Sequence, residues 1–169
     1  DQGSINRFGF NNDGMDVIAD RLFQRPAGAV IGLNLGANKD SLDKSSDFAK
    51  VLARCGTHVD FATVNVSSPN TEKLRDLQGA EALAKLLSGV MQARASLPRP
   101  IPIFLHIAPD LTDPEIYKIS DLARPTELHA ILANYHTTSR DRLPPPHRDE
   151  IGAPSGRTLV PKPIPIHAT

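Results

Sequence analysis

Four short apolar segments alternate with stretches of helical periodicity, and this alternation restricts the possible folds more than any other feature of the sequence. The segments span residues 29–35, 59–66, 101–107 and 128–133, and each is rich in aliphatic or β-branched residues. Strands separated by helices at this spacing form βαβ units, whose right-handed crossovers place the strands parallel in one sheet. The sequence therefore predicts an α/β fold with about four parallel strands.

The segments between these strands carry apolar residues at helical intervals. After the first strand, Phe48, Val51, Leu52 and Cys55 recur at i, i+3, i+4 and i+7, which is the spacing of a single helix face. Gly56 follows directly and is expected to end that helix. The other helices are expected at residues 14–24, around residues 83–91 and after residue 112.

Each predicted strand finishes on a polar side chain. These residues are Asn34, Asn65, His106 and Asn134. Ligands of parallel sheets and barrels bind at the carboxyl ends of the strands, so four polar ends in succession indicate a shared ligand face. The alternative, which is the better explanation for any single strand, is that a polar residue simply begins a loop.

The densest polar motif lies directly after the second strand, at residues 65–71. The amides of Asn65 and Asn70 can each donate and accept hydrogen bonds, which suits a planar polar ligand. Pro69 fixes a turn next to Ser68. The motif therefore holds the first candidates for binding and catalysis.

Composition excludes several classes of function. The 19 basic residues balance the 19 acidic ones, so the chain lacks the positive charge of a non-specific nucleic-acid binder. The single cysteine, Cys55, cannot form an internal disulfide, which favours a reducing, intracellular compartment. The cysteine and histidine residues do not have the spacing of a zinc site, so no metal site is expected. The apolar runs are too short for a transmembrane segment, so an intracellular soluble protein is expected.

Several motifs, taken in order and spacing, resemble dihydroorotate dehydrogenase. They are INRFGFNN at residues 5–12, GLNLGANK at 32–39, NVSSPNT at 65–71 with LRDLQG at 74–79, and IAPDLT at 107–112. The resemblance extends over about residues 5–156. Ser68 stands where class 2 enzymes of this family have serine and class 1 enzymes have cysteine. The chain is thus similar to the quinone-linked, membrane-associated class, which is mitochondrial in eukaryotes.

The resemblance implies an FMN-dependent oxidation of dihydroorotate to orotate in pyrimidine biosynthesis. Ser68 would be the catalytic residue that takes a proton from one ring carbon while the adjacent carbon passes a hydride to FMN. Asn6, Asn65 and Asn70 would bind the substrate, with Phe10 packing nearby. A serine hydroxyl is a weak base, so Ser68 would need an acceptor network or a water relay.

The same resemblance implies a set of residues that bind the cofactor FMN. Asn34 and Asn65 would meet the flavin, and His106, Gly152 and Ser155 stand at further cofactor positions. His106 replaces the lysine of the family, whose cation would stabilise negative charge on the reduced flavin. Histidine carries a positive charge over only part of the ordinary pH range and reaches less far. A hydrogen-bonded histidine at a strand end is therefore expected, rather than an acid or a ligand.

The family's Asn-Thr-Thr motif after the fourth strand is altered. Counting back from Ser139 and Arg140 puts Tyr135, and not Asn134, at the position of the substrate-binding asparagine. Neighbouring side chains on a strand point to opposite faces, so a shift of one residue changes which side chain enters the site. Asn134 is therefore not assigned to the site.

The chain is expected to form only part of a (β/α)8 barrel, because a closed barrel needs eight strands and about 250 residues. Residues 1–140 are expected to form a partial barrel. Residues 141–169, with seven of the fifteen prolines, are expected to be an irregular loop or extended tail. An open half-barrel exposes sheet edges and an apolar face, so a protein partner is expected to cover it and the isolated chain to be inactive. The alternative is an inactive remnant of the family that acts as a structural subunit of a larger mitochondrial assembly.

Overall fold

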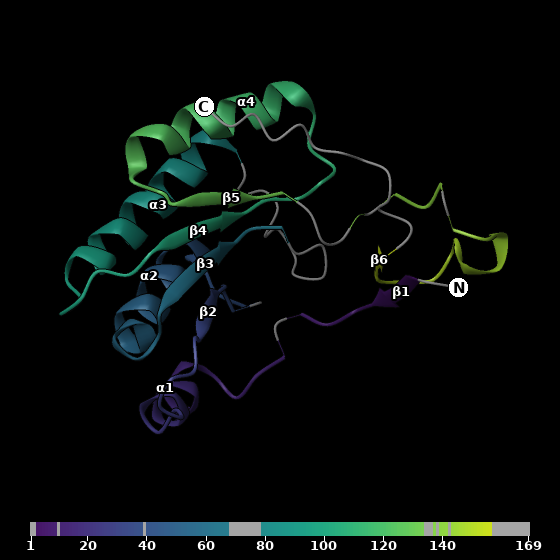
Figure 1. Cartoon of the computed structure of the whole chain (residues 1–169). Coiled ribbons are helices and arrows are strands. Elements are labelled where there is room, and N and C mark those ends of the chain that lie inside the picture. The colour runs from purple at the N-terminus through teal and green to yellow at the C-terminus, as the bar shows by residue number, and fades with distance from the viewer. Residues whose placement is uncertain are drawn as a thin grey trace.

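The computed structural model describes residues 3–9, 11–38, 40–67, 79–133, 137, 139–141 and 143–156. Figure 1 shows a sheet with helices on one side and a small two-stranded ribbon beyond the carboxyl ends of the sheet strands. The strands are β1 (Gly3–Asn6), β2 (Gly32–Leu35), β3 (Phe61–Asn65), β4 (Ile103–His106), β5 (Ala130–Leu132) and β6 (Ala153–Gly156). The α-helices are α1 (Met15–Phe23), α2 (Lys44–Cys55), α3 (Ala80–Ala95) and α4 (Asp113–Ala123). Within the described residues, short 3₁₀ helices span Gly56–His58, Arg124–Thr126 and Pro145–His147.

The four predicted strands pair in the order β2-β3-β4-β5, and every pair is parallel. Each strand is shorter than the apolar run that predicted it. Val59, Ile101 and Ile107 lie just beyond the strand ends and are at most 1% exposed. Only the central residues of each apolar run form the strand. The flanking residues are also apolar because the chain is buried where it enters and leaves the sheet.

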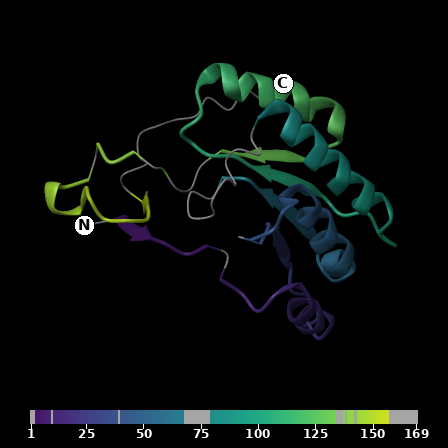
Figure 2. The same ribbon diagram turned by 180° about the vertical axis from the view of Figure 1, so that it is seen from behind.

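The helices α2, α3 and α4 lie on one face of the sheet, where Figures 1 and 2 both place them. Alternate strand residues such as Leu35, Val64 and Leu105 point into this layer and are fully buried. The apolar faces of α2 and α3 pack against them through residues that include Phe48 and Leu86. Buried residues alternate with more exposed ones along β2, β3 and β4, so the more exposed side chains lie on the opposite face of the sheet, where the site is.

Local sequence signals account for the helix ends. The carboxylate of Asp43 accepts a hydrogen bond from the backbone N–H of Ser46 and begins α2, as expected for an N-cap aspartate. Thr112 and Glu115 form the reciprocal capping box of α4. Hydrogen bonds from the hydroxyl and backbone N–H of Thr112 lower the pKa of the Glu115 carboxyl. Among the described residues, none of the helices combines the length and apolar character that a membrane span needs.

Gly56 ends α2 as predicted, but for a different physical reason. Its φ of −60° is helical and not left-handed, and the chain continues into a 3₁₀ helix. A Cβ at this position would lie 2.9 Å from Leu97 Cδ1 and 3.0 Å from Leu52 Cδ1. A larger residue would require these two leucine side chains to shift, so their close approach favours glycine.

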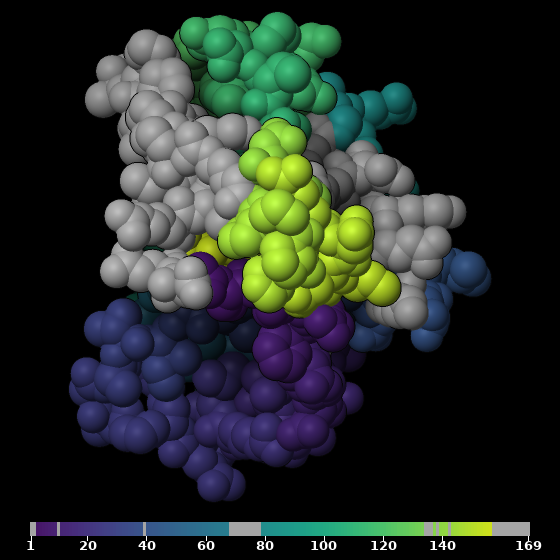
Figure 3. All heavy atoms as spheres, turned by 90° about the vertical axis from the view of Figure 1, so that its right-hand side faces the viewer, coloured from purple at the N-terminus to yellow at the C-terminus, as the bar shows by residue number. Residues whose placement is uncertain are grey.

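The sequence did not indicate the antiparallel ribbon of β1 and β6. Asn6 pairs with Ala153, and Gly3 pairs with Gly156, so the two ends of the described chain lie side by side. Figure 3 shows the same arrangement, with the yellow-green segment against the purple N-terminal segment. Part of the proline-rich tail thus forms an ordered strand at the carboxyl-end side of the sheet.

Candidate functional site at the carboxyl ends of the strands

Three of the predicted site residues lie side by side on the sheet face that the helices leave uncovered. Asn65 and His106 are the last residues of β3 and β4 and are direct neighbours in the parallel register. Asn34 lies one residue before the end of β2 and pairs with Thr63. The parallel sheet therefore brings these three side chains to one edge, as the sequence predicted from its polar strand ends.

A connected series of hydrogen bonds joins these side chains. The Nδ2 of Asn65 donates to the Oδ1 of Asn34 over 3.1 Å. The Oδ1 of Asn65 accepts from the backbone N–H of Ser67 over 3.1 Å and from its Oγ over 2.9 Å. The Oγ of Ser67 also lies 3.4 Å from the Nδ1 of His106. We call these four residues the amide cluster.

Aromatic side chains lie on the same sheet face as the amide cluster, nearer the amino ends of β3 and β4. The rings of Phe61 and Phe104 are 5.3 Å apart between centroids. The Phe61 ring lies over Gly32, where a Cβ would come within 2.2 Å of its nearest ring atom. Leu132 of β5 is the cross-strand neighbour of His106. The face thus combines an apolar floor with a polar rim, which suits a flat ligand with polar edges.

The remaining described candidates lie in the β1–β6 ribbon and not in the amide cluster. Asn6 is half-buried at the end of β1, where its Oδ1 accepts from the backbone N–H of Phe8 over 3.3 Å. Gly152 precedes β6 and its carbonyl accepts from Arg140 over 2.5 Å. The hydroxyl of Ser155 donates to the Ser4 carbonyl over 3.4 Å. The structure therefore brings the predicted residues together in two groups.

Other predicted positions fall outside the described residues. They are Phe10, Ser68, Asn70, Asn134 and Tyr135. The catalytic role of Ser68, the substrate contacts of Phe10 and Asn70, and the displacement of Asn134 by Tyr135 stay predictions. Ser67 directly precedes Ser68 and is the last described residue before this gap.

Two polar residues near the strand ends were not singled out from the sequence. Ser67 is 8% exposed and Thr137 is 4% exposed. The hydroxyl of Thr137 donates to the carboxylate of Asp110, and its backbone N–H donates to the carbonyl of Pro154 over 3.2 Å. These bonds join the loop after β4 to β6. For Ser67 a signal was present, because residues i and i+2 of an extended segment share a face and Asn65 was already a candidate.

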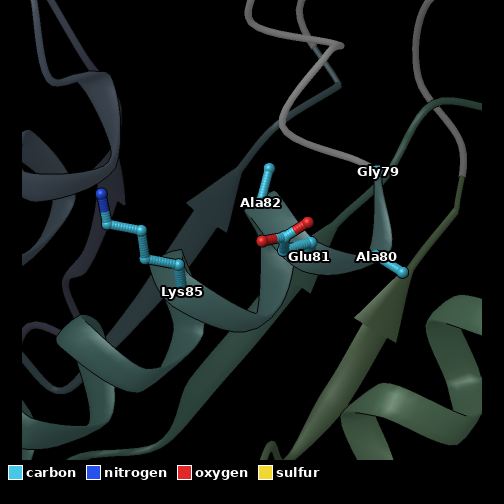
Figure 4. Close-up of a pocket in the computed structure, with 5 residues that line it drawn as sticks. All are labelled: Gly79, Ala80, Glu81, Ala82 and Lys85. Carbon is cyan, nitrogen blue, oxygen red and sulfur yellow. The ribbon is translucent and has the colours of Figure 1, made fainter.

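A hollow of about 500 Å³ lies at the first turn of α3. Gly79, Ala80, Glu81, Ala82 and Lys85 line it. Figure 4 shows the Glu81 and Lys85 side chains extending in different directions from the helix. Within the described ranges, the side chains of His, Cys, Asp and Glu do not gather in a group that could hold a metal ion. The amide cluster is therefore the better candidate site, because its polar groups converge.

Comparisons with known proteins identify the family of the chain. The sequence model of the family described as "Dihydroorotate dehydrogenase" matches residues 1–164. The chain belongs to the dihydroorotate dehydrogenase family. A dihydroorotate dehydrogenase (quinone) of Cereibacter sphaeroides is 58% identical over 160 residues, which are 94% of this chain and 45% of that protein. An enzyme of the same name from Agrobacterium fabrum is 43% identical over 164 residues, with the same two coverages.

Solved structures of this family match the fold. A ligand-free dihydroorotate dehydrogenase of Eimeria tenella has a TM-score of 0.85 at 32% identity, over 93% of this chain and 50% of that one. Its complex with ferulenol also has a TM-score of 0.85 and covers 93% of this chain and 49% of that one. These matches confirm the prediction of a partial (β/α)8 barrel. The chain spans about half the length of the relatives it matches.

Proposed function

We propose that this chain supplies the face on which an FMN-dependent dihydroorotate dehydrogenase binds the flavin ring and its substrate. The observation that carries the proposal is the amide cluster, which joins the carboxyl ends of β2, β3 and β4 in a member of this family. Ligands of such barrels bind at this end of the strands. FMN, when bound, accepts the hydride that leaves dihydroorotate as it becomes orotate.

The donor set of the amide cluster fits the ring of a flavin. A flavin ring is flat, with apolar faces and an edge of alternating carbonyl and nitrogen groups. The cluster occupies both amide oxygens, so Asn34 offers its amide N–H groups to such an edge and Asn65 its second N–H. The Phe61 and Phe104 rings lie on the same sheet face. His106 occupies the position of the family's lysine, whose side chain is expected next to the flavin. Asn34, Asn65 and His106 are therefore the residues we propose to hold the ring, and Gly152 and Ser155 are proposed as further cofactor contacts.

Substrate binding and proton transfer are proposed for neighbouring residues. Asn6, Asn65 and Asn70, with Phe10, are proposed to hold dihydroorotate, and Ser68 is proposed to accept the ring proton. A serine hydroxyl accepts a proton only when a further acceptor or a water takes its own.

Turnover by the isolated 169-residue chain is proposed to be slow or absent. The helices of the described residues cover one face of a four-stranded sheet, and further strands would enclose the site on the other face. Quinone as electron acceptor is proposed from the names of the curated relatives. Association with the inner mitochondrial membrane stays a prediction that rests on the resemblance alone.

Titration with FMN tests the proposed face directly. Flavin fluorescence should show saturable binding to the full chain, and Asn65→Ala should weaken it about tenfold, since two or more hydrogen bonds of the cluster are lost. Gln92→Ala removes an exposed amide from α3 and is the matched control. No binding by the wild-type chain, or equal binding by Asn65→Ala, would contradict the proposal.

Anaerobic addition of dihydroorotate tests the role of Ser68. In a preparation whose flavin is bleached by dihydroorotate, Ser68→Ala should slow the bleaching by roughly 10²- to 10⁴-fold while the chain still binds FMN. Ser88→Ala, on the exposed side of α3, should bleach at the wild-type rate. An unchanged rate in Ser68→Ala would remove its assignment as the base.

His106 favours a second candidate function. Position 106 has histidine in place of the family's lysine and its fixed cation, and a family member with this change is proposed to have a structural role in a larger assembly. In that case the native complex should be colourless, and unrelated subunits should cover the uncovered face of the sheet. A yellow complex bleached by dihydroorotate would exclude this alternative.

A further inference from the structure

We infer that Ser67 is a positioning residue that fixes the orientation of Asn65, Asn34 and the imidazole of His106 through one directed series of hydrogen bonds. Ser67 is 8% exposed, so bulk water competes little with its bonds. The series begins at a group whose polarity is beyond doubt, which is the backbone N–H of Ser67. Each further step follows from the donors and acceptors that each side chain has.

The first step assigns the two amides. The oxygen and nitrogen of an asparagine side chain are distinguished by their hydrogen-bond partners. A backbone N–H can only donate, so the Asn65 atom 3.1 Å from Ser67 N must be its Oδ1. The Nδ2 of Asn65 then faces Asn34 over 3.1 Å and can only donate, so Asn34 turns its Oδ1 toward Asn65. The N–H groups of Asn34 consequently point away from Asn65.

The second step assigns the imidazole. A carboxamide oxygen carries no proton, so the hydroxyl of Ser67 must donate its single proton to Asn65 Oδ1 over 2.9 Å. The Oγ of Ser67 can then only accept from the Nδ1 of His106, which is 3.4 Å away. His106 therefore holds a proton on Nδ1, and in its neutral form Nε2 is the acceptor.

The series gives the rim of the site a defined polarity. The N–H groups of Asn34 point away from Asn65, and when His106 is neutral its Nε2 is an acceptor rather than a donor. Without the Ser67 hydroxyl, nothing in the series would select Nδ1 over Nε2 as the protonated nitrogen. The hydrogen bonds themselves are contacts within this chain. Only the inference that they orient side chains toward a flavin or substrate rests on the proposed function.

Long-range ¹H–¹⁵N correlation spectra of the full chain test the assignment at a pH where imidazoles are neutral. His106→Gln identifies the signals of His106 among the six histidines. In the wild-type chain, Nδ1 should resonate as a protonated nitrogen and Nε2 as an unprotonated one. In Ser67→Ala, the ratio of the Nδ1–H to the Nε2–H form should fall by roughly fivefold, the factor that one ordinary hydrogen bond supplies.

Two further variants complete the experiment. Ser120→Ala removes a hydroxyl that donates to the Ile116 carbonyl within α4, and it should leave the His106 signals unchanged. Ser67→Thr keeps the hydroxyl and should keep the Nδ1–H form. A wild-type His106 that carries its proton on Nε2, or an identical ratio in the wild type and Ser67→Ala, would overturn the inference. The wild-type spectrum decides even where a variant does not fold, and failure to bind FMN would contradict the proposed function without altering this result.

Discussion

Asp60 joins three segments of the chain at the amino ends of the strands. Its carboxylate accepts from the two terminal nitrogens of Arg25 over 2.8 and 3.1 Å and from the backbone N–H of Ile31 over 2.9 Å. Arg99 lies 3.7 Å away. The hydrogen bonds from Arg25, followed by the one from Ile31, hold the pKa of the Asp60 carboxyl below its usual range.

This lowered pKa predicts how stability depends on pH. A carboxyl with a lower pKa in the folded chain stabilises it above the unfolded pKa of about 3.9, and this stabilisation is lost as pH falls through the folded pKa. Asp60→Asn should therefore be less stable at neutral pH and show a weaker fall in the free energy of unfolding below about pH 4. Urea unfolding at a series of pH values measures both effects. Asp121→Asn, an exposed carboxylate on α4, is the control, and parallel curves for the wild type and Asp60→Asn would contradict the account.

Single residues of the site were only partly predictable from the sequence. Asn34, Asn65 and His106 could be placed together because each lies at or next to the end of a parallel strand, and parallel strands share one carboxyl edge. Ser67 was overlooked because its importance depends on burial and on which atoms it contacts, and neither is visible in a motif that contains two adjacent serines. The tie between Thr137 and Asp110 depends on loops that meet only in the folded chain.

At the scale of elements, the packing of α2 against α3 and the sheet forms the core. Phe48 of α2 is fully buried within it. Phe48→Ala should lower the free energy of unfolding by about 3–5 kcal/mol, because it removes apolar contacts and leaves a cavity. Leu42→Ala, at a fully exposed position before α2, should change it little. Chemical denaturation measures the two differences, and equal effects would contradict the proposed core.

The β1–β6 ribbon makes a separate prediction at Gly152. The φ of this residue is +134°, and a Cβ there would lie 2.5 Å from the carbonyl oxygen of Asn6. Gly152→Ala should therefore cost about 1–3 kcal/mol and lower the hydrogen-exchange protection of β1 and β6.

Gly89→Ala is the matched control for this substitution. Gly89 lies within α3, where a Cβ would have only an ordinary contact of 3.8 Å with Ala49. Alanine there should stabilise the chain by roughly 0.5–1 kcal/mol, since glycine is a poor helix former. Destabilisation by both variants to the same extent would contradict the special role of Gly152.

The helices and the parallel strands were predictable, whereas the ribbon was not. Helix and strand periodicities are local, and capping residues such as Thr112 and Asp43 mark boundaries within a few positions. The pairing of β1 with β6 joins residues about 150 positions apart. Pro154 also argues against a strand, because proline lacks a backbone donor and is tolerated only at strand edges. Pro154 pairs with Ile5 of β1. Among the described residues β6 pairs with β1 alone, so β6 is an edge strand and can accommodate proline.

At the scale of the whole molecule, stability and binding are assigned to opposite ends of the sheet. The Asp60 interactions lie at the amino ends of the strands, and the amide cluster lies at the carboxyl ends. This division is typical of (β/α)8 barrels. The α/β class and the partial barrel were predictable from strand alternation and length. The uncovered sheet face and its row of Phe61 and Phe104 required the register between strands.

The central claim is that the carboxyl ends of β2, β3 and β4 form one ligand face, and chemical-shift mapping of the full chain with FMN and orotate tests it most directly. The account predicts that the side-chain amides of Asn34 and Asn65 and the backbone N–H of Ser67 shift in a saturable manner. The backbone signals of Glu81 and Lys85, at the hollow on α3, should stay in place. Shifts confined to that hollow, or no saturable shifts at the amide cluster, would contradict the account.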